Sequence, residues 1–247
     1  MIVIVGETAS GKSALALALA KRLNGEIICA DSQTIRKEAN IGTSKPSKSP
    51  QKAITHHLLD IIEPDEPFNV AQFKDLANEA INDISNRGKL PIMVGGTGLY
   101  IDSVIFDYQF GSSQSDKTLR SNTLILGIQI SREELKQKVH ARTRQMINNG
   151  LAEEAKTLAN KYGWDCEVLQ AIGYREWREY FAEKPNEKSQ TEQIPIEEIE
   201  AKINKDTLEL AKKQRTWFKR NKSIQWLSTP VKLDGIVDLA TTFFTNN

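Results

Sequence analysis

Residues 6–13 of this 247-residue chain read GETASGKS, which fits the phosphate-loop pattern G-x-x-x-x-G-K-[ST] at every fixed position. The apolar residues 2–5 predict a short buried strand before the loop, and residues 14–20 after it are strong helix formers. Strand, glycine-rich loop and helix let backbone N–H groups and a helix N-terminus converge on phosphate oxygens. The pattern therefore predicts an α/β domain that binds a di- or triphosphate such as that of ATP, but not the reaction that follows.

Each part of this loop has an expected role. Lys12 would place a cation at the terminal phosphates, and the Ser13 hydroxyl is a ligand for Mg²⁺, the metal we expect here. The predicted phosphate site consists of Gly6, Glu7, Thr8, Ala9, Ser10, Gly11, Lys12 and Ser13.

The rest of the chain alternates between strand and helix patterns. Further strands are predicted at 26–30, 58–62, 90–94 and 123–130, and helices at 70–85 and 132–148, the latter with Ser131 as N-cap and Gly150 beyond its end. From residue 152 the pattern is mainly helical and closes with a short strand at 224–227 and a terminal helix. This order predicts one P-loop NTPase-like domain over residues 1–247, in which helices cover both faces of a parallel sheet. The loosest stretches are 110–122 and 183–194.

Composition excludes several classes of protein. No apolar run approaches the roughly 20 residues that a membrane span requires, and the chain opens directly on its first strand, so we expect no signal peptide, a cytoplasmic location and no membrane partner. Cys29 and Cys166 stand alone and suit core packing in a reducing compartment. Three histidines and two cysteines in no ligand spacing argue against a structural zinc site.

The net charge of +1 conceals a strong local asymmetry. Residues 201–222 hold eight basic and two acidic residues, and residues 36–52 hold five basic and one acidic residue. Residues 183–200 reverse the balance, with six acidic and two basic residues. Most charged runs are only solvated faces, but two basic stretches on a phosphate-binding fold favour a polyanionic partner.

Two further segments leave strands at the sheet edge where the phosphate loop lies. Asp31-Ser32 follows the second strand, and GGTGLY at 95–100 follows the strand at 90–94. Ligands of such sheets gather beyond the carboxyl ends of the strands. Asp31 could take a proton there or serve as a turn residue or N-cap, and Thr97 could orient an acceptor or pack its loop. The spacing alone leaves these alternatives open.

Taken together with several other motifs, these segments resemble one family, the tRNA dimethylallyltransferases, also called IPP transferases. The motifs are GETASGKS, Asp31-Ser32, IGTSKP at 41–46, HHLLDI at 56–61, GGTGLY, Arg142-x-x-x-Met146-x-x-x-Gly150-Leu151-x-Glu153-Glu154, Ile172-Gly173-Tyr174 and AKKQxTWF at 211–218. They occur in the family's order over nearly the whole chain, and GGTGLY and AKKQxTWF are much more specific than the phosphate loop.

The resemblance implies a P-loop α/β fold and transfer of a five-carbon prenyl group from dimethylallyl diphosphate to N6 of adenosine 37, next to the anticodon of tRNA. It implies that Asp31 is the general base, that Thr97 contacts the substrate nucleoside, and that Arg142 and Lys212 join the phosphate loop at the diphosphate. The implied tRNA contacts are Asp31, Ser32, Gln33, Thr34, Thr97 and Arg120. The implied partners are dimethylallyl diphosphate and an anticodon stem-loop, with the protein acting as a monomer.

The chain departs from the family at three places. Residues 33–40 differ from the family's usual segment after Asp-Ser, which helps to grip RNA. A helical insertion is missing at 110–122, where Asp116-x-x-x-Arg120 matches the segment that would enter it. Leu208 stands where the family has an arginine that points at the diphosphate, and Lys205 or Lys212, three before and four after it on a helix, could supply that cation.

Several residues and functions keep a second interpretation. His56-His57 could contact phosphate but better suits the entry to a strand, Asp60 is expected to be structural, and Trp217 and Phe218 are expected to pack rather than stack on a base. A free adenine nucleotide is the alternative acceptor, which would make the protein an adenylate isopentenyltransferase. A P-loop nucleotide kinase and a nucleotide-dependent switch or RNA-binding module without chemistry remain as further classes.

Overall fold

The computed structural model describes residues 1–108, 110, 118–182 and 194–246. Its centre is a sheet of parallel strands in the order β3-β2-β4-β1-β5-β6. The strands are β1 (Ile2–Gly6), β2 (Gly25–Ala30), β3 (His56–His57), β4 (Leu90–Gly95), β5 (Leu124–Gln129) and β6 (Gln225–Ser228). The predicted α/β fold with a parallel sheet is confirmed.

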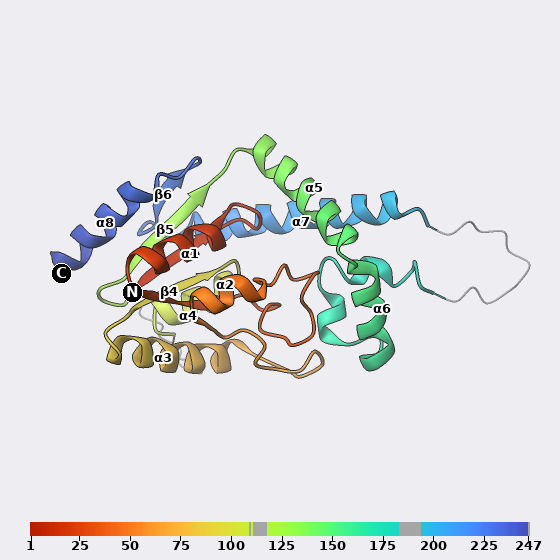
Figure 1. Cartoon of the computed structure of the whole chain (residues 1–247), viewed down its shortest axis with the longest axis horizontal. Coiled ribbons are helices and arrows are strands. Elements are labelled where there is room, and N and C mark those ends of the chain that lie inside the picture. Colours follow the sequence, from red (N-terminus) through yellow and green to blue (C-terminus); the bar gives the residue numbers. More distant parts are fainter. Residues whose placement is uncertain (109, 111–117, 183–193, 247) are drawn as a thin grey trace, which may run out of the picture.

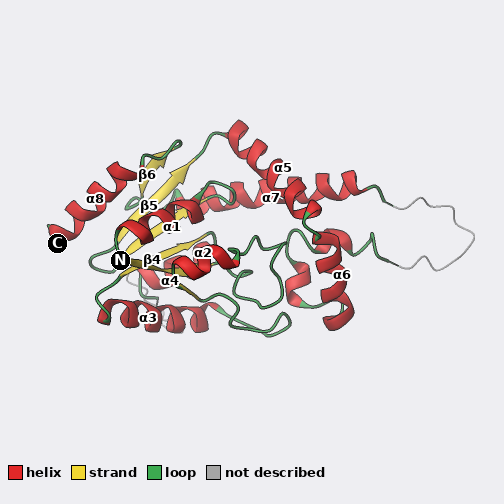
Figure 2. Cartoon of the chain, viewed as in Figure 1, coloured by secondary structure: helices red, strands yellow, loops and turns green. Residues whose placement is uncertain are grey.

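Helices cover both faces of this sheet (Figures 1 and 2). They are α1 (Lys12–Arg22), α2 (Lys48–Ala53), α3 (Val70–Asn86), α4 (Gly98–Ile105), α5 (Arg132–Asn148), α6 (Leu151–Tyr162), α7 (Ile196–Phe218) and α8 (Leu233–Thr245), with short 3₁₀ turns at Glu167–Gln170 and Arg175–Trp177. Helices α1 and α8 pack on one face, and α3, α4 and the end of α7 pack on the other. None of the helices in the described part of the chain is both long and apolar enough to cross a membrane.

Strand β1 shows why the sheet needs both layers. Its residues are all buried, with Val3 and Val5 in the core under α3 and α4, and Ile2 and Ile4 in the core under α1. A strand without a polar face cannot lie against water, so alternate side chains must meet apolar helices on opposite sides. This central position also fixes where the loop that leaves β1 emerges.

The predicted third strand at 58–62 is wrong. The strand is His56–His57, and it pairs with Ile27 and Ile28 of β2. Leu58 and Asp60 have φ angles of 61° and 53°, a left-handed conformation that interrupts extended pairing. Only Ile62 returns to pair, through an isolated bridge to Arg36.

The predicted helix at 132–148 is confirmed, and Ser131 caps it by accepting a hydrogen bond from the Glu134 N–H (3.2 Å). The mainly helical part after residue 150 has a core of its own, built from α6, the two 3₁₀ turns and the first half of α7 around Trp177. It lies beside the carboxyl edge of the sheet in Figure 1. The loose stretches expected at 110–122 and 183–194, and Asp116, lie largely outside the described residues.

Candidate active site

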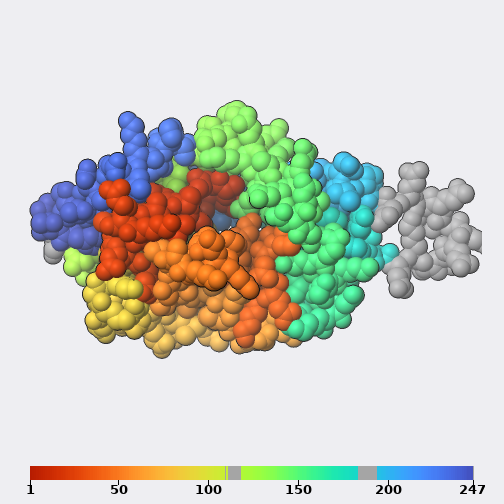
Figure 3. Space-filling model, viewed as in Figure 1, coloured from red at the N-terminus to blue at the C-terminus, as the bar shows by residue number. Residues whose placement is uncertain are grey.

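A cavity of about 900 Å³ opens at the carboxyl edge of the sheet. The loop after β1, the segment after β2, the loop after β4, and helices α5 and α7 all line it. Figure 3 shows the hollow between the N-terminal segment, the segment that follows β2 and α5. The strand order therefore brings together the three segments that the sequence placed at this edge.

The phosphate loop lines the cavity with Thr8, Ala9, Gly11, Lys12 and Ser13. Ala9 and Gly11 have positive φ angles of 59° and 98°, a left-handed conformation that occurs in the backbone nests that bind anions. Helix α1 begins at Lys12, and no side chain in the described part of the chain caps it. Its first N–H groups therefore remain available to an anion at the positive end of the helix dipole.

Two cations face the same space. Lys12 and Arg142 both line the cavity, and Arg142 Nη1 donates a hydrogen bond to Thr8 Oγ1 (3.0 Å). Burial lowers the pKa of Lys12 to about 8, an effect that Arg142 strengthens and Asp31 and Glu7 oppose. Burial also lowers the pKa of Arg142. Two buried cations that repel each other are both stabilised by a bound anion, so this site favours a polyanion.

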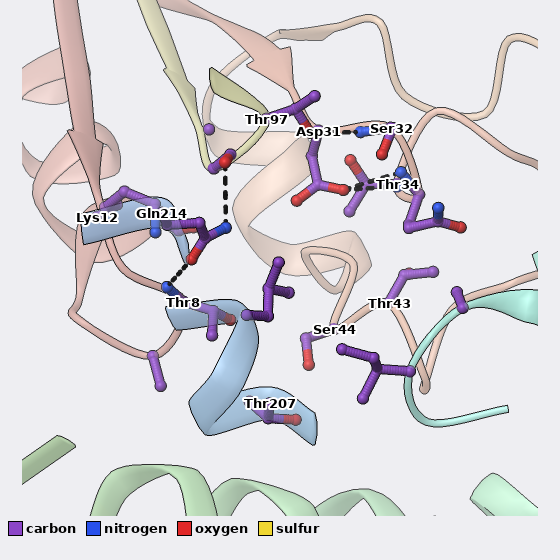
Figure 4. Close-up of a pocket in the computed structure, with 18 of the residues that line it drawn as sticks. Thr8, Lys12, Asp31, Ser32, Thr34, Thr43, Ser44, Thr97, Thr207 and Gln214 are labelled. Carbon is purple, nitrogen blue, oxygen red and sulfur yellow. Dashed lines mark hydrogen bonds between the residues drawn. The ribbon is translucent and has the colours of Figure 1, made fainter. Parts of the chain in front are cut away.

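Asp31 and Thr97 lie together opposite the phosphate loop (Figure 4). Asp31 Oδ1 accepts hydrogen bonds from the N–H groups of Gln33 (2.9 Å) and Thr34 (3.3 Å). The Ser32 N–H donates to Thr97 Oγ1 (3.1 Å). Asp31 is thus a turn residue whose carboxylate also faces the cavity, and its role as a base stays a prediction.

Gln214 of α7 connects the two sides of the site. Its Oε1 accepts a hydrogen bond from the Thr8 N–H (2.7 Å), and its Nε2 donates to the Gly96 carbonyl (3.1 Å). A Cβ on Gly96 would lie 2.3 Å from Gln214 Nε2, which explains why a glycine stands there. This glutamine belongs to the AKKQxTWF motif, whose spacing alone assigns it no role.

Glu154 of α6 holds the loop at 40–46 against the cavity. Its carboxylate accepts hydrogen bonds from the N–H groups of Asn40, Ile41 and Gly42 and from the Tyr174 hydroxyl, at 2.6–3.0 Å. A Cβ on Gly42 would lie 2.3 Å from Tyr174 Cζ, so the ring packs directly on the glycine. Three motifs that are far apart in the sequence therefore form one wall of the site.

Most of the predicted site residues meet at the cavity, but some do not. The residues that line it are Thr8, Ala9, Gly11, Lys12, Ser13, Asp31, Ser32, Gln33, Thr34, Thr97 and Arg142. Gly6, Glu7 and Ser10 belong to the same loop, but they are buried and do not line the cavity.

The two lysines expected to substitute for the family arginine at Leu208 lie outside the lining of the cavity. Neither Lys205 nor Lys212 lines the cavity, whereas Lys213 does. Leu208 packs against the apolar contact between α5 and α7, so the face of α7 that carries it is turned into a helix–helix interface. A diphosphate role for Lys212 thus has no support from this geometry. Besides Lys12, the basic residues among the described lining of the cavity are Lys138, Arg142, Arg175 and Lys213.

Arg120 also lies away from the cavity. It donates a hydrogen bond to Asn78 Oδ1 (2.6 Å) and stands near the N-terminal ammonium group, at the end of the sheet opposite the phosphate loop. Its expected contact with tRNA stays a prediction that cannot involve this cavity.

The remaining candidates are mostly structural. His57 bonds to Glu26 (2.7 Å), which Arg87 and Lys89 also contact, and these partners hold the pKa of the buried Glu26 carboxyl well below its usual range. His56, by contrast, lines the cavity.

Most of the residues that were predicted to have structural roles have them. Asp60 pairs with Lys45, Phe218 is buried, and both cysteines are free and buried, as expected. Trp217 lines the cavity and donates to Asp102 through Nε1 (2.9 Å). No group of three His, Cys, Asp or Glu residues that could hold a metal occurs among the described residues.

Comparison with known proteins gives consistent results. The family model described as IPP transferase matches residues 34–122 and 109–221, in two parts that meet where the family's insertion was expected to be missing. The tRNA dimethylallyltransferase of Anoxybacillus flavithermus is 35% identical over 92% of this chain and 89% of its own length. That of Staphylococcus carnosus is 31% identical over 96% and 95%.

A solved structure agrees over the whole chain. The tRNA isopentenylpyrophosphate transferase of Staphylococcus epidermidis superposes with a TM-score of 0.85, at 29% identity, over 100% of this chain and 99% of that one. An entire fold is therefore shared, including the elements that surround the cavity.

Proposed function

The chain belongs to the IPP transferase family, and from that premise we propose that it transfers a dimethylallyl group from dimethylallyl diphosphate to N6 of adenosine 37 in tRNA. The observation that carries the proposal is the meeting of a phosphate loop with Asp31 and Thr97 across one cavity. A free adenine nucleotide as acceptor and a kinase reaction are not favoured, because the relatives are named as tRNA enzymes.

The phosphate loop would stabilise the leaving group. As the bond from the allylic carbon to oxygen breaks, negative charge develops on the departing diphosphate. The backbone N–H groups of the loop, Lys12 and Arg142 would be in place before that charge appears. Because the leaving oxygens carry more negative charge in the transition state than in the ground state, donors already directed at them stabilise the transition state more.

Asp31 would accept the proton that N6 loses. The adenine amino group is a weak nucleophile because its lone pair is delocalised into the ring, so a base must act as the C–N bond forms. Asp31 Oδ1 is held by two backbone N–H groups, which orients the carboxylate toward the cavity. Thr97, held by the Ser32 N–H, would position the nucleoside beside it.

The residues present fit Mg²⁺. Ser13 lines the cavity beside Lys12, as the metal-binding hydroxyl of a phosphate loop should. Mg²⁺ retains several waters and takes its other ligands from phosphate oxygens, so it does not require a cluster of acidic side chains. When bound, it would add positive charge at the diphosphate.

We further propose that the protein works as a monomer in the cytoplasm. Two buried, unpaired cysteines suit a reducing compartment. Equilibrium sedimentation with and without an anticodon stem-loop would test the monomer.

An acceptor assay tests the function. The protein is incubated with dimethylallyl diphosphate, Mg²⁺ and either an anticodon stem-loop or AMP, and the products are analysed for an added isopentenyl mass. We expect the stem-loop to be modified far faster than AMP, at the adenosine 3′ of the anticodon. A stem-loop in which that adenosine is replaced by guanosine is the matched control. Preferential modification of AMP would overturn the proposal.

A further inference from the structure

The phosphate loop contains a carboxylate that does not face the cavity. Glu7 is 5% exposed and does not line the cavity, although it precedes the inward-facing Thr8. The Glu7 carbonyl accepts a hydrogen bond from Lys12 Nζ (2.6 Å), and its charge acts on the Lys12 pKa. A buried anion this close to a diphosphate site would repel the substrate unless something neutralises it.

Arg215 of α7 neutralises it. Arg215 Nε lies 2.7 Å from Glu7 Oε1, and Arg215 Nη2 donates to Glu7 Oε2 (2.8 Å). The same Nη2 donates to the Ile130 carbonyl at the end of β5 (3.3 Å). Both carboxylate oxygens are therefore engaged by one planar fork, the arrangement in which arginine pairs most strongly with a carboxylate.

The Glu7–Arg215 pair lies next to a contact that Gln214 makes with the phosphate loop. Gln214 binds the N–H of Thr8, and Arg215 binds the side chain of Glu7, so two adjacent residues of α7 hold two adjacent residues of the phosphate loop. Because Gln214 also reaches Gly96, the end of α7 fixes the loop relative to the segment that carries Thr97.

We propose that Arg215 is a positioning residue of this site. It cancels the charge of Glu7, so affinity for the diphosphate of the substrate falls when the Glu7 carboxylate is left unpaired, although neither side chain touches the substrate. This inference rests on the proposed function only for the identity of the substrate. A charge effect and a packing effect of Arg215 make different predictions for the double variant.

A double-mutant cycle separates them. Isothermal calorimetry on the full chain measures the binding of inorganic diphosphate with Mg²⁺, and kinetics give KM and kcat for dimethylallyl diphosphate. Arg215→Met should weaken diphosphate affinity and raise KM by about tenfold or more, because a buried carboxylate is left unpaired beside the site. Glu7→Gln removes the buried charge but also weakens the contact with Arg215, so it should lose less affinity than Arg215→Met does. Glu7→Gln with Arg215→Met should bind more tightly than Arg215→Met alone, to within about threefold of Glu7→Gln.

Arg22→Met is the control, since Arg22 pairs with Asp234 (3.1 Å) in an exposed ion pair remote from the cavity. A double variant as weak as Arg215→Met, or wild-type affinity in Arg215→Met, would overturn the inference. If Arg215→Met does not fold, Arg215→Lys with and without Glu7→Gln gives the same comparison with a smaller loss. A wild type that binds diphosphate but does not prenylate the stem-loop would contradict the proposed function and leave the binding cycle interpretable.

Discussion

At the scale of single residues, Lys12 is a cation of the cavity whose pKa burial lowers. Its pKa of about 8 lies below the ordinary lysine value of 10.5 because the ammonium group is buried. The free protein therefore loses this charge as the pH rises through about 8, and a bound diphosphate would favour the charged form.

The kinetics should show this titration. We expect kcat/KM for dimethylallyl diphosphate to be flat below pH 8 and to fall by about tenfold per pH unit above it, because kcat/KM reports groups of the free enzyme. Lys12→Ala should give a low profile without this step, and the exposed Lys21→Ala on the same helix should keep it. A wild-type profile that stays level to pH 9.5 would contradict the assignment.

Asp31 offers a second test at this scale, because asparagine can preserve its structural bonds. In Asp31→Asn the side-chain oxygen can still accept from the Gln33 and Thr34 N–H groups, but the base is lost. We expect kcat to fall by at least about 10²-fold while calorimetry shows unchanged diphosphate affinity.

The comparison with Asp31→Ala, which also removes the turn bonds, separates chemistry from loop structure. Near wild-type turnover in Asp31→Asn would mean that Asp31 serves only the turn and that the base lies elsewhere.

At the scale of elements, the loop at 40–46 depends on α6 for its shape. Glu154 alone satisfies three consecutive N–H groups of this loop. Glu154→Ala leaves them unpaired, which should lower the free energy of unfolding by about 1–3 kcal/mol in denaturant titrations.

Since the loop lines the cavity away from the phosphate loop, KM for the stem-loop should rise about tenfold while diphosphate affinity stays unchanged. The exposed neighbour Glu153→Ala is the matched control. A rise in KM for both substrates would mean that the loop does not act on the acceptor alone.

At the scale of the whole molecule, charge is the property that connects the site to RNA. The basic stretch 201–222 runs along α7 and past its end, and Lys213 lines the cavity while Lys212 is exposed beside it. Each phosphate neutralised contributes roughly −0.7 to −0.9 to the slope of log affinity against log salt.

Replacing Lys212 and Lys213 together with alanine should therefore flatten that slope for the stem-loop by about one to two units, as measured by fluorescence anisotropy over a salt series. Lys21→Ala with Lys232→Ala removes the same charge away from this stretch and should leave the slope unchanged. Equal slopes for both double variants would exclude α7 as the RNA-binding surface.

Much of the fold could be predicted because its signals are local. The phosphate loop, the apolar residues of β1 and the capped helix α5 each carry their pattern within a few residues, and parallel strands bring the segments after β1, β2 and β4 to one edge. The prediction of a strand at 58–62 was wrong for a local reason as well. Leu58 and Asp60 adopt a left-handed conformation that no glycine marks in the sequence.

The sequence by itself determined the fold class, the family resemblance and the three loops that meet at the cavity. Only the tertiary structure decided that Lys213 rather than Lys212 lines it, because the rotation of α7 is set by the packing of Leu208 and Ala211 against α5. Likewise Gln214 and Arg215 meet Thr8 and Glu7 across more than 200 residues of sequence. Such pairs depend on the position and rotation of a helix packed on a sheet. The periodicity of either segment predicts which face is buried, but not which residues of the other segment that face meets.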